Sequence, residues 1–315
     1  MSDHVYDLVI IGAGPAGLSA AIYASRSMLD AVALEREAVG GQVILTSEVD
    51  NYPGVPHADG FGLVDAMREQ AEGLGARIVM DPVSTIDRDD ASGLFRVNGA
   101  SETYVTRTVV AALGARPRQA GFEGESRYVG RGVSYCATCD GMFYRNKHVF
   151  VIGGGNSAAE EALFLARIAS KVTVIVRKDH LRAQQALVDE LLANDKVELR
   201  LQTSLIAADG GDLLSEMTFR DNASGREYTE TFDEGSRGIF VLVGRVPETE
   251  ALRGLVSLDE SGYVITDPRM ATETPGLYVA GDAREKPLRQ IVTAAADGAV
   301  AATSAAAFLG RPIEG

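Results

Sequence analysis

The sequence predicts an α/β protein made of two related three-layer domains, each with an added antiparallel β-meander, and three observations lead to this fold class. An apolar strand runs into a glycine-rich turn and a helix-like segment twice, at residues 8–27 and again at residues 148–169. Each unit leads, through a polar turn typical of a meander, to another apolar strand that ends in glycine. The remaining segment, from about residue 248, is too short for a third domain.

The first unit begins with the strand 8–11, followed at once by Gly12-Ala13-Gly14-Pro15-Ala16-Gly17. We expect a helix over 18–27 and a strand over 31–34. Asp90-Ala91-Ser92-Gly93 has the composition of a hairpin turn. The strand 108–114 completes this half of the repeat.

The second unit repeats this order. The strand 148–152 leads into Gly153-Gly154-Gly155-Asn156-Ser157-Ala158. A helix is expected over 159–169 and a strand over 172–176. Asn222-Ala223-Ser224-Gly225 is the corresponding turn, and 238–244 is the corresponding strand.

The last segment carries a strand at 277–280, Gly281-Asp282 and a final helix, and we expect it to return and complete the first domain. The predicted domains are therefore residues 1–117 together with 248–315, and residues 118–247. The two crossings, near 115–120 and 244–249, contain glycine and have Pro117 and Pro247 nearby. They are candidate hinges.

Charge and composition exclude several functional classes. The chain has 315 residues and a formal charge of -14, which argues against a general nucleic-acid or anionic-membrane binder. The first residues are acidic, and the apolar run after them is too short for a signal peptide. Asp297 and Gly298 interrupt the alanine-rich C-terminal stretch, which predicts a packed helix rather than a membrane span. We expect a cytoplasmic protein.

The two glycine-rich turns sit in the strand–turn–helix context of Rossmann-like nucleotide-binding domains. Glycines permit a tight turn and a close approach of the backbone to a pyrophosphate, and the helix N-terminus supplies amide donors. Glycine turns without a ligand are the alternative for either unit. The candidate binding residues are Gly12, Gly14, Pro15, Ala16 and Gly17 in the first unit and Gly153, Gly155, Asn156 and Ser157 in the second.

The ends of the two second strands differ in charge. Glu35 ends the first, where an acid binds a ribose hydroxyl and suits FAD or NAD. Arg177 and Lys178 occupy the same place in the second unit, with Arg182 close behind, and such cations suit a 2′-phosphate. A solvated helix start is the alternative for this cluster. The first site therefore suits FAD and the second NADPH.

The chain has two cysteines, and they form Cys136-Ala137-Thr138-Cys139. A structural zinc site needs four protein ligands, so we expect no metal. A CxxC pair in such a protein favours a redox dithiol over a buried, inert pair. Asp140, the next residue, is a candidate proton donor or acceptor, or else the cap of a following helix.

At these motifs the chain resembles the low-molecular-weight thioredoxin reductases from end to end. Cys136-Ala137-Thr138-Cys139-Asp140-Gly141 is similar to that family's redox motif. The chain departs from the family at Leu113, which we expect FAD binding to tolerate, and at Val176-Arg177-Lys178, which we expect to reduce NADPH affinity or discrimination. A third departure is Tyr135, which we expect to affect partner recognition. The resemblance implies further FAD contacts at Gly41, Gln42, Asn51, Val83, Ala112, Gly114, Gly281, Asp282, Arg289 and Gln290.

The resemblance also implies a reaction. Electrons would pass from NADPH to FAD, then to the Cys136–Cys139 disulfide and on to thioredoxin, with the NADPH domain rotating between the steps. Cys139 would face the flavin, Cys136 would attack thioredoxin, and Asp140 would manage the thiol protons. Family members are homodimers. The alternatives are a ferredoxin-dependent disulfide reductase, an oxygen-using dithiol oxidase and, in another class, a flavin-binding redox sensor.

Overall fold

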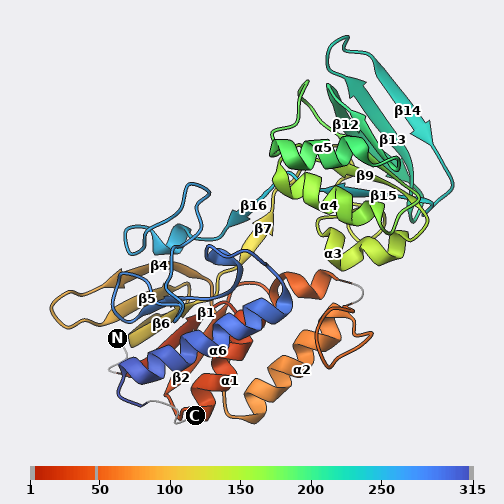
Figure 1. Ribbon diagram of the computed structural model, residues 1–315. Helices are drawn as coiled ribbons and strands as arrows, with labels where there is room; N and C mark the ends of the chain where they lie inside the picture. The colour runs from red at the N-terminus through yellow and green to blue at the C-terminus, as the bar shows by residue number, and fades with distance from the viewer. Residues whose placement is uncertain (1–3, 47–48, 312–315) are drawn as a thin grey trace. The chain divides into compact units, whose positions relative to one another are not determined.

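The computed structural model describes residues 4–46 and 49–311 (Figure 1). The chain divides into two compact units. The first comprises Met1–Arg116 together with Val246–Gly315, and the second comprises Pro117–Arg245. Where the chain crosses between them, β7 (Ala115–Pro117) and β16 (Arg245–Pro247) pair as a two-stranded sheet.

The first unit is built on a seven-stranded sheet with the order β3-β2-β1-β6-β5-β4, and β17 pairs with β6. β3, β2, β1, β6 and β17 run parallel, whereas β4 and β5 form an antiparallel meander with the first part of β6. The bounds are β1 Val5–Ile11, β2 Ala31–Glu35, β3 Arg77–Met80, β4 Val83–Arg88, β5 Phe95–Gly99, β6 Thr103–Ala111 and β17 Leu277–Val279.

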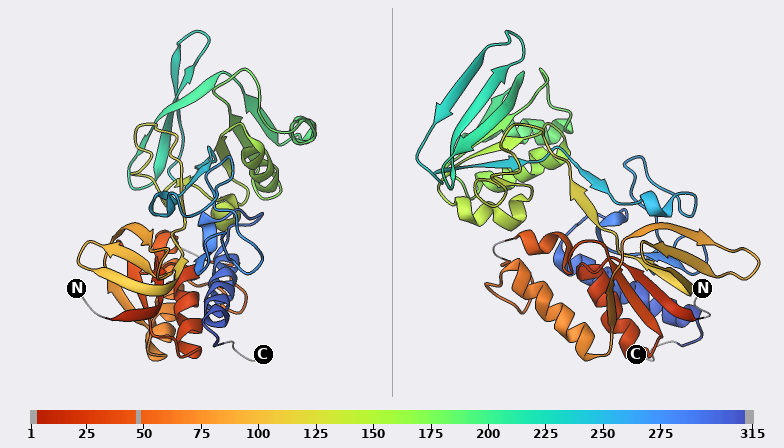
Figure 2. Two further views of the ribbon diagram at one scale, coloured as in Figure 1. Left: turned by 90° about the vertical axis from the view of Figure 1, so that its left-hand side faces the viewer. Right: turned by 180° about the vertical axis from the view of Figure 1, so that it is seen from behind.

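Three helices cover one face of the parallel strands, and the meander covers the other (Figures 1 and 2). Leu8 and Ile10 point to the helices, whereas Val9 and Ile11 pack towards Phe95 of the meander. This alternation along β1 produces the three layers. The helices are α1 (Pro15–Arg26), α2 (Gly60–Gly73) and α6 (Ile291–Phe308), with the short turns η1 (Gly41–Leu45), η3 (Glu250–Leu252) and η4 (Gly281–Ala283) between the elements.

Helix α6 is long and apolar enough to cross a membrane by length and composition alone. Ala301, Ala302 and Ala305 on it are nevertheless completely buried among α1 and the sheet. A Cβ atom on Gly298 would lie 1.9 Å from the Ala16 carbonyl oxygen, so the two helices meet at van der Waals contact. This packing identifies α6 as a core helix of the first unit.

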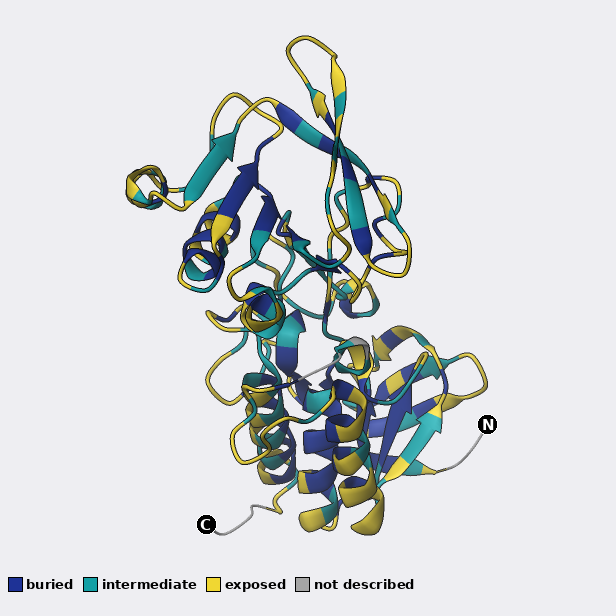
Figure 3. Cartoon of the chain, turned by 90° about the vertical axis from the view of Figure 1, so that its right-hand side faces the viewer, coloured by how far each residue is buried: buried dark blue, intermediate teal, exposed yellow. Residues whose placement is uncertain are grey.

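The second unit has a parallel five-stranded sheet with the order β11-β10-β9-β15-β8. Val149 and Val151 on β9 face α4, and Phe150 and Ile152 face a separate antiparallel sheet of β12, β13 and β14 (Figures 1 and 3). The bounds are β8 Val133–Ser134, α3 Ala137–Asp140, η2 Gly141–Tyr144, β9 His148–Ile152, α4 Asn156–Ala166, β10 Lys171–Ile175, α5 Gln185–Ala193, β11 Val197–Arg200, β12 Thr203–Gly210, β13 Leu214–Asp221, β14 Glu227–Thr231 and β15 Arg237–Val241.

The predicted fold class is confirmed, with differences at the ends of elements. Helix α1 begins at Pro15, three residues before the expected start at 18, because proline is pre-organised for the first helical turn. The expected helix 159–169 runs instead over Asn156–Ala166. The strands expected over 108–114 and 238–244 end at Ala111 and Val241, because the chain turns there towards Gly114 and Gly244, both at positive φ.

Candidate functional site

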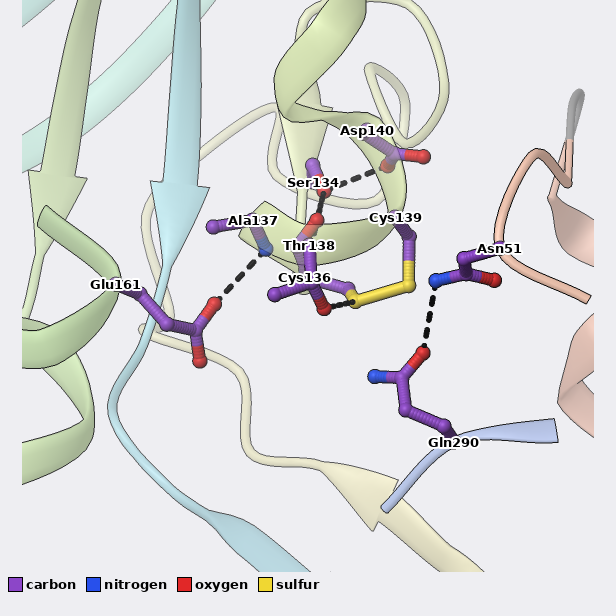
Figure 4. Close-up of a disulfide and its surroundings, with 9 residues drawn as sticks. All are labelled: Asn51, Ser134, Cys136, Ala137, Thr138, Cys139, Asp140, Glu161 and Gln290. Atoms are coloured by element: carbon purple, nitrogen blue, oxygen red, sulfur yellow. Dashed lines mark hydrogen bonds between the residues drawn. A yellow bond between two sulfur atoms is a disulfide. The ribbon is translucent and has the colours of Figure 1, made fainter. Parts of the chain in front are cut away.

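The two cysteines occupy a single helical turn at the end of β8. Cys136 precedes α3 and Cys139 lies within it, and the turn brings their Cα atoms to 5.3 Å (Figure 4). The two sulfurs form a disulfide, and both residues are partly exposed. A disulfide at this position, with access to solvent, can exchange with a thiol from outside.

Asp140 directly follows Cys139 and is hydrogen-bonded to Ser134 on β8. Its Oδ2 accepts a hydrogen bond of 2.6 Å from the Ser134 hydroxyl (Figure 4). Burial raises the pKa of the Asp140 carboxyl, and the Ser134 hydrogen bond opposes part of that effect. The side chain does not cap the following turn η2, contrary to the helix-cap alternative. A half-buried carboxyl beside the cysteine pair is suited to hold a proton.

Sequence reasoning missed Glu161, which lies on α4. The Ala137 backbone N–H donates a hydrogen bond of 2.8 Å to Glu161 Oε2 (Figure 4). Burial raises the pKa of this carboxyl, and the Ala137 hydrogen bond and the charge of Arg245 oppose the rise. Helical spacing could have identified it, because Glu161 lies three residues after the buried Ala158 and therefore on the inward face of α4.

Tyr135, which we expect to affect partner recognition, is partly buried and packs against the core of the second unit. Its hydroxyl donates a hydrogen bond of 2.8 Å to Glu125 Oε1. The buried Glu125 carboxylate also accepts the backbone N–H groups of Ala120 and Gly121. Burial, aided by Glu125, raises the pKa of Tyr135. The residue before Cys136 is thus connected to the chain that enters the second unit.

The glycine turn of the first unit is closed on both sides. A Cβ atom on Gly12 would lie 2.4 Å from the Ala112 carbonyl oxygen, and one on Gly17 would lie 1.8 Å from the Gly12 carbonyl oxygen. Glu35 Oε2 accepts the Ala13 N–H at 2.7 Å. The acid that the sequence assigned to a ribose therefore also fixes the glycine turn. Gly14 is more open, because its nearest neighbour would lie 3.9 Å from an added Cβ.

The other candidate residues of the first unit form two hydrogen-bonded sets. Gln42 Nε2 donates to the Ala115 carbonyl at 2.7 Å, and Asn51 Nδ2 donates to Gln290 Oε1 at 3.0 Å. The Arg289 guanidinium lies over the Tyr263 ring at 3.9 Å, while its buried Nε has no hydrogen-bond partner among the residues that the structure describes. The remaining candidates lie at or beside strand ends, with Val83 at the start of β4, Ala112 and Gly114 after β6, and Gly281 and Asp282 after β17.

The glycine turn of the second unit lies beside the predicted cations. The Arg182 backbone N–H donates to the Gly154 carbonyl at 2.6 Å, and the Gln184 N–H donates to Asn156 Oδ1 at 2.8 Å. These bonds fold the loop after β10 onto the start of α4. Arg177, Lys178 and Arg182 are exposed in this loop, Ser157 is exposed on the first turn of α4, and Gly153 and Gly155 complete the turn.

The arrangement can hold anions at two glycine turns and exchange electrons at one disulfide. In the first unit, Arg289 Nε, which has no hydrogen-bond partner among the described residues, and the open face of Gly14 fit a bound cofactor. In the second unit, a Cβ added to Gly155 would have no described residue within 4 Å other than its neighbours along the chain. Within residues 4–46 and 49–311, no group of three or more His, Cys, Asp or Glu residues is arranged to hold a metal ion.

Comparisons with known proteins agree with this geometry. The pyridine nucleotide-disulphide oxidoreductase family matches residues 6–298. The chain is 42% identical over 310 residues to a thioredoxin reductase of Peptoclostridium acidaminophilum, which covers 98% of both chains. It is similar to the crystal structure of thioredoxin reductase from Streptococcus pyogenes MGAS5005, with 40% identity, a TM-score of 0.91 and coverage of 98% of this chain and 99% of that one. It is also similar to thioredoxin reductase from Giardia duodenalis, with 31% identity, a TM-score of 0.89 and coverage of 98% and 100%.

The family model matches residues 6–298, and the relative from Peptoclostridium acidaminophilum is 42% identical over 98% of the chain, so the family of this chain is shown. Membership of this family implies a flavin and a pyridine nucleotide. The chain therefore belongs to the pyridine nucleotide-disulphide oxidoreductase family and, within it, to the low-molecular-weight thioredoxin reductases.

Proposed function

We propose that this protein reduces the disulfide of thioredoxin with electrons from NADPH, using FAD and the Cys136–Cys139 pair. The observation that carries the proposal is the accessible disulfide in a turn of the unit that also holds the second glycine fingerprint. When bound, the flavin supplies the transfer of a hydride from the nicotinamide and of electrons to the disulfide. The protein supplies the placement of both.

The first unit is the proposed FAD domain. The amides at the start of α1 suit a pyrophosphate, and Glu35 keeps lone pairs for a ribose hydroxyl while it binds Ala13. Arg289 has a donor left for the cofactor. We assign the other contacts to Gly12, Gly14, Pro15, Ala16, Gly17, Gly41, Gln42, Asn51, Val83, Ala112, Gly114, Gly281, Asp282 and Gln290.

The second unit is the proposed NADPH domain. The backbone bond from Arg182 to Gly154 brings the loop of Arg177, Lys178 and Arg182 to the start of α4, where the pyrophosphate would bind. Three exposed cations there would bind a 2′-phosphate and favour NADPH over NADH. The same cluster argues for a nucleotide donor over ferredoxin. We assign Gly153, Gly155, Asn156 and Ser157 to the remaining nucleotide contacts.

The dithiol chemistry follows thiol–disulfide exchange. The Cys136 thiolate attacks a thioredoxin sulfur and forms a mixed disulfide, and the released thioredoxin thiolate takes a proton from Asp140. The Cys139 thiolate then attacks the Cys136 sulfur, which releases reduced thioredoxin and restores the Cys136–Cys139 disulfide. We further propose a homodimer in the cytoplasm, where thiols are held reduced.

The test is anaerobic NADPH oxidation by the FAD-loaded protein, with thioredoxin and a final disulfide acceptor. We expect thioredoxin-dependent turnover that is lost in Cys139→Ser. Arg177→Ala combined with Arg182→Ala should raise the KM for NADPH about tenfold or more and leave that for NADH unchanged. Flavin reduction without thioredoxin reduction would make the assigned partner wrong. A flavin that NADPH does not reduce would favour a ferredoxin-dependent enzyme or an oxidase.

A further inference from the structure

The peptide that joins Cys136 to Ala137 is held by a side chain from another helix. Its N–H belongs to Ala137 and donates to Glu161 Oε2 at 2.8 Å (Figure 4). Ala137 is completely buried, so water cannot replace Glu161 as the acceptor at this position. The contact therefore fixes the backbone of the attacking cysteine.

Helix α3 is too short to hold its own shape. It spans only Ala137–Asp140, and an isolated helix of one turn is unstable in water. In the oxidised protein the disulfide closes this turn covalently. Reduction breaks that link, and the hydrogen bonds of the turn must then maintain its conformation.

Two of the remaining attachments connect the turn to α4. Glu161 binds its start, and at its end an added Cβ on Gly141 would lie 3.2 Å from Leu165 Cδ2. Helix α4 begins at Asn156, in the glycine fingerprint. The redox turn and the start of the nucleotide site are thus fixed to one helix.

We propose that Glu161 is a positioning residue, which holds the Cys136–Ala137 peptide on α4 and so keeps the CxxC turn in its reactive shape when the disulfide is reduced. This inference rests on the proposed function, because it assumes that the cysteine pair cycles between disulfide and dithiol. It adds a residue that does not touch the substrate and acts through the backbone of Cys136.

The charge of Glu161 has a second effect. Its neighbours are the Ala137 N–H, Arg245 and Glu160, and burial raises its pKa. When ionised, it places negative charge beside the Cys136 peptide and disfavours the Cys136 thiolate. Glu161→Gln keeps a hydrogen-bond acceptor and removes the charge, whereas Glu161→Leu removes both.

The experiment compares these two variants in the FAD-loaded protein. We expect Glu161→Leu to lower kcat for thioredoxin about tenfold or more, with the KM for NADPH unchanged, because it loses the hydrogen bond to Ala137. Glu161→Gln should stay within about threefold of wild type. Glu234→Leu is the matched control, because Glu234 Oε1 accepts the Gly211 N–H at 3.0 Å on an exposed surface. It should behave as wild type.

A second measurement does not depend on turnover. In the Cys139→Ser background, the rate of Cys136 alkylation by iodoacetamide at pH 8 should rise about threefold in Glu161→Gln, because the thiolate is no longer opposed by a carboxylate. If Glu161→Leu matches wild type in both measurements, or if Gln performs no better than Leu in turnover, the inference is wrong. If wild-type protein fails to reduce thioredoxin, the proposed function fails, while the alkylation rates still test Glu161.

Discussion

Lys286 and Asp297 form a buried ion pair beside the proposed FAD site. Lys286 Nζ lies 2.6 Å from Asp297 Oδ2, and the two side chains are only 4% and 10% exposed. The same carboxylate oxygen accepts the Gly281 N–H at 3.1 Å. Helix α6 is thereby tied to η4, which contains Gly281 and Asp282.

Removing only the cation of this ion pair should destabilise the folded protein. Lys286→Met should lower the free energy of unfolding by about 3–5 kcal/mol, because the Asp297 carboxylate remains buried without its closest cation. Arg284, at 3.6 Å, can offset part of the loss. Urea unfolding at pH 7 measures the change.

A double variant separates the charge from the packing. Lys286→Met with Asp297→Asn keeps an acceptor for Gly281 and removes both charges of the pair, so it should recover more than half of the lost stability. If the single variant unfolds at the wild-type urea concentration, this pair does not stabilise the first unit.

Burial raises the pKa of Asp140, and the hydrogen bond from Ser134 opposes that rise. Ser134→Ala should therefore raise the pKa of Asp140 further, and the protonated acid should persist to higher pH. The rate of thioredoxin reduction should fall with rising pH as Asp140 ionises. In Ser134→Ala this fall should occur at higher pH than in wild type.

The measurement is the pH dependence of single-turnover thioredoxin reduction. Asp140→Asn should remove this decline and slow the step about a hundredfold. Ser257→Ala is the matched control, because the Ser257 hydroxyl donates to the Glu273 carboxylate at 2.8 Å on the surface of the first unit. An unchanged profile in Ser134→Ala would exclude Asp140 as the titrating group.

Two glycines in equivalent turns should respond differently to a methyl group. Gly17→Ala would place its Cβ 1.8 Å from the Gly12 carbonyl oxygen, so α1 must move and FAD retention should be lost. The methyl group of Gly155→Ala would have none of the described residues within 4 Å apart from its chain neighbours. This variant should fold normally and raise the KM for NADPH about tenfold, because the methyl group occupies the approach to the phosphates. Thermal unfolding and flavin content measure the first effect, and steady-state kinetics the second. Equal KM values in Gly155→Ala and wild type would contradict a phosphate at this turn.

The sequence predicted those parts of the fold that depend on local patterns. Short continuous apolar runs predicted β1 and β9, and the glycine spacing predicted the turns that follow them, because each signal spans only a few residues. The exact ends of α1 and α4 were not predicted, because apolar spacing begins only after the polar or glycine positions of the first turn.

In the candidate site, too, only residues that belong to a local motif were predicted from the sequence. Cys136, Cys139 and Asp140 are adjacent in sequence, so one motif identifies them. Glu161 and Asp297 were not predicted as parts of a site, since each works through a partner distant in sequence, Ala137 for one and Lys286 for the other. Only the folded chain brings such groups together.

His148 gives the second unit a pH dependence of its own. Its Nε2 lies 2.8 Å from Thr173 Oγ1, between β9 and β10. Burial lowers its pKa from 6.5 to about 4, and Arg237, Lys171 and Arg200 add to the effect. The folded pKa lies below the unfolded one, so this contribution to stability is complete above pH 6.5 and is lost as pH falls towards 4.

His148→Gln should remove that dependence, because glutamine can bind Thr173 but does not titrate. Between pH 7 and pH 5, the loss of stability should be smaller than in wild type by about 1–2 kcal/mol. Carboxylates of lowered pKa do not account for this window, and Asp140 and Glu161, whose pKa values burial raises, act in the opposite direction. The pKa of Glu198, for example, falls from 4.5 to about 2, so its contribution is lost only below pH 4.5. Urea unfolding at pH 7, 6 and 5 measures the free energy of unfolding of both proteins. If this free energy changes with pH equally in His148→Gln and wild type, His148 titrates normally in the folded protein.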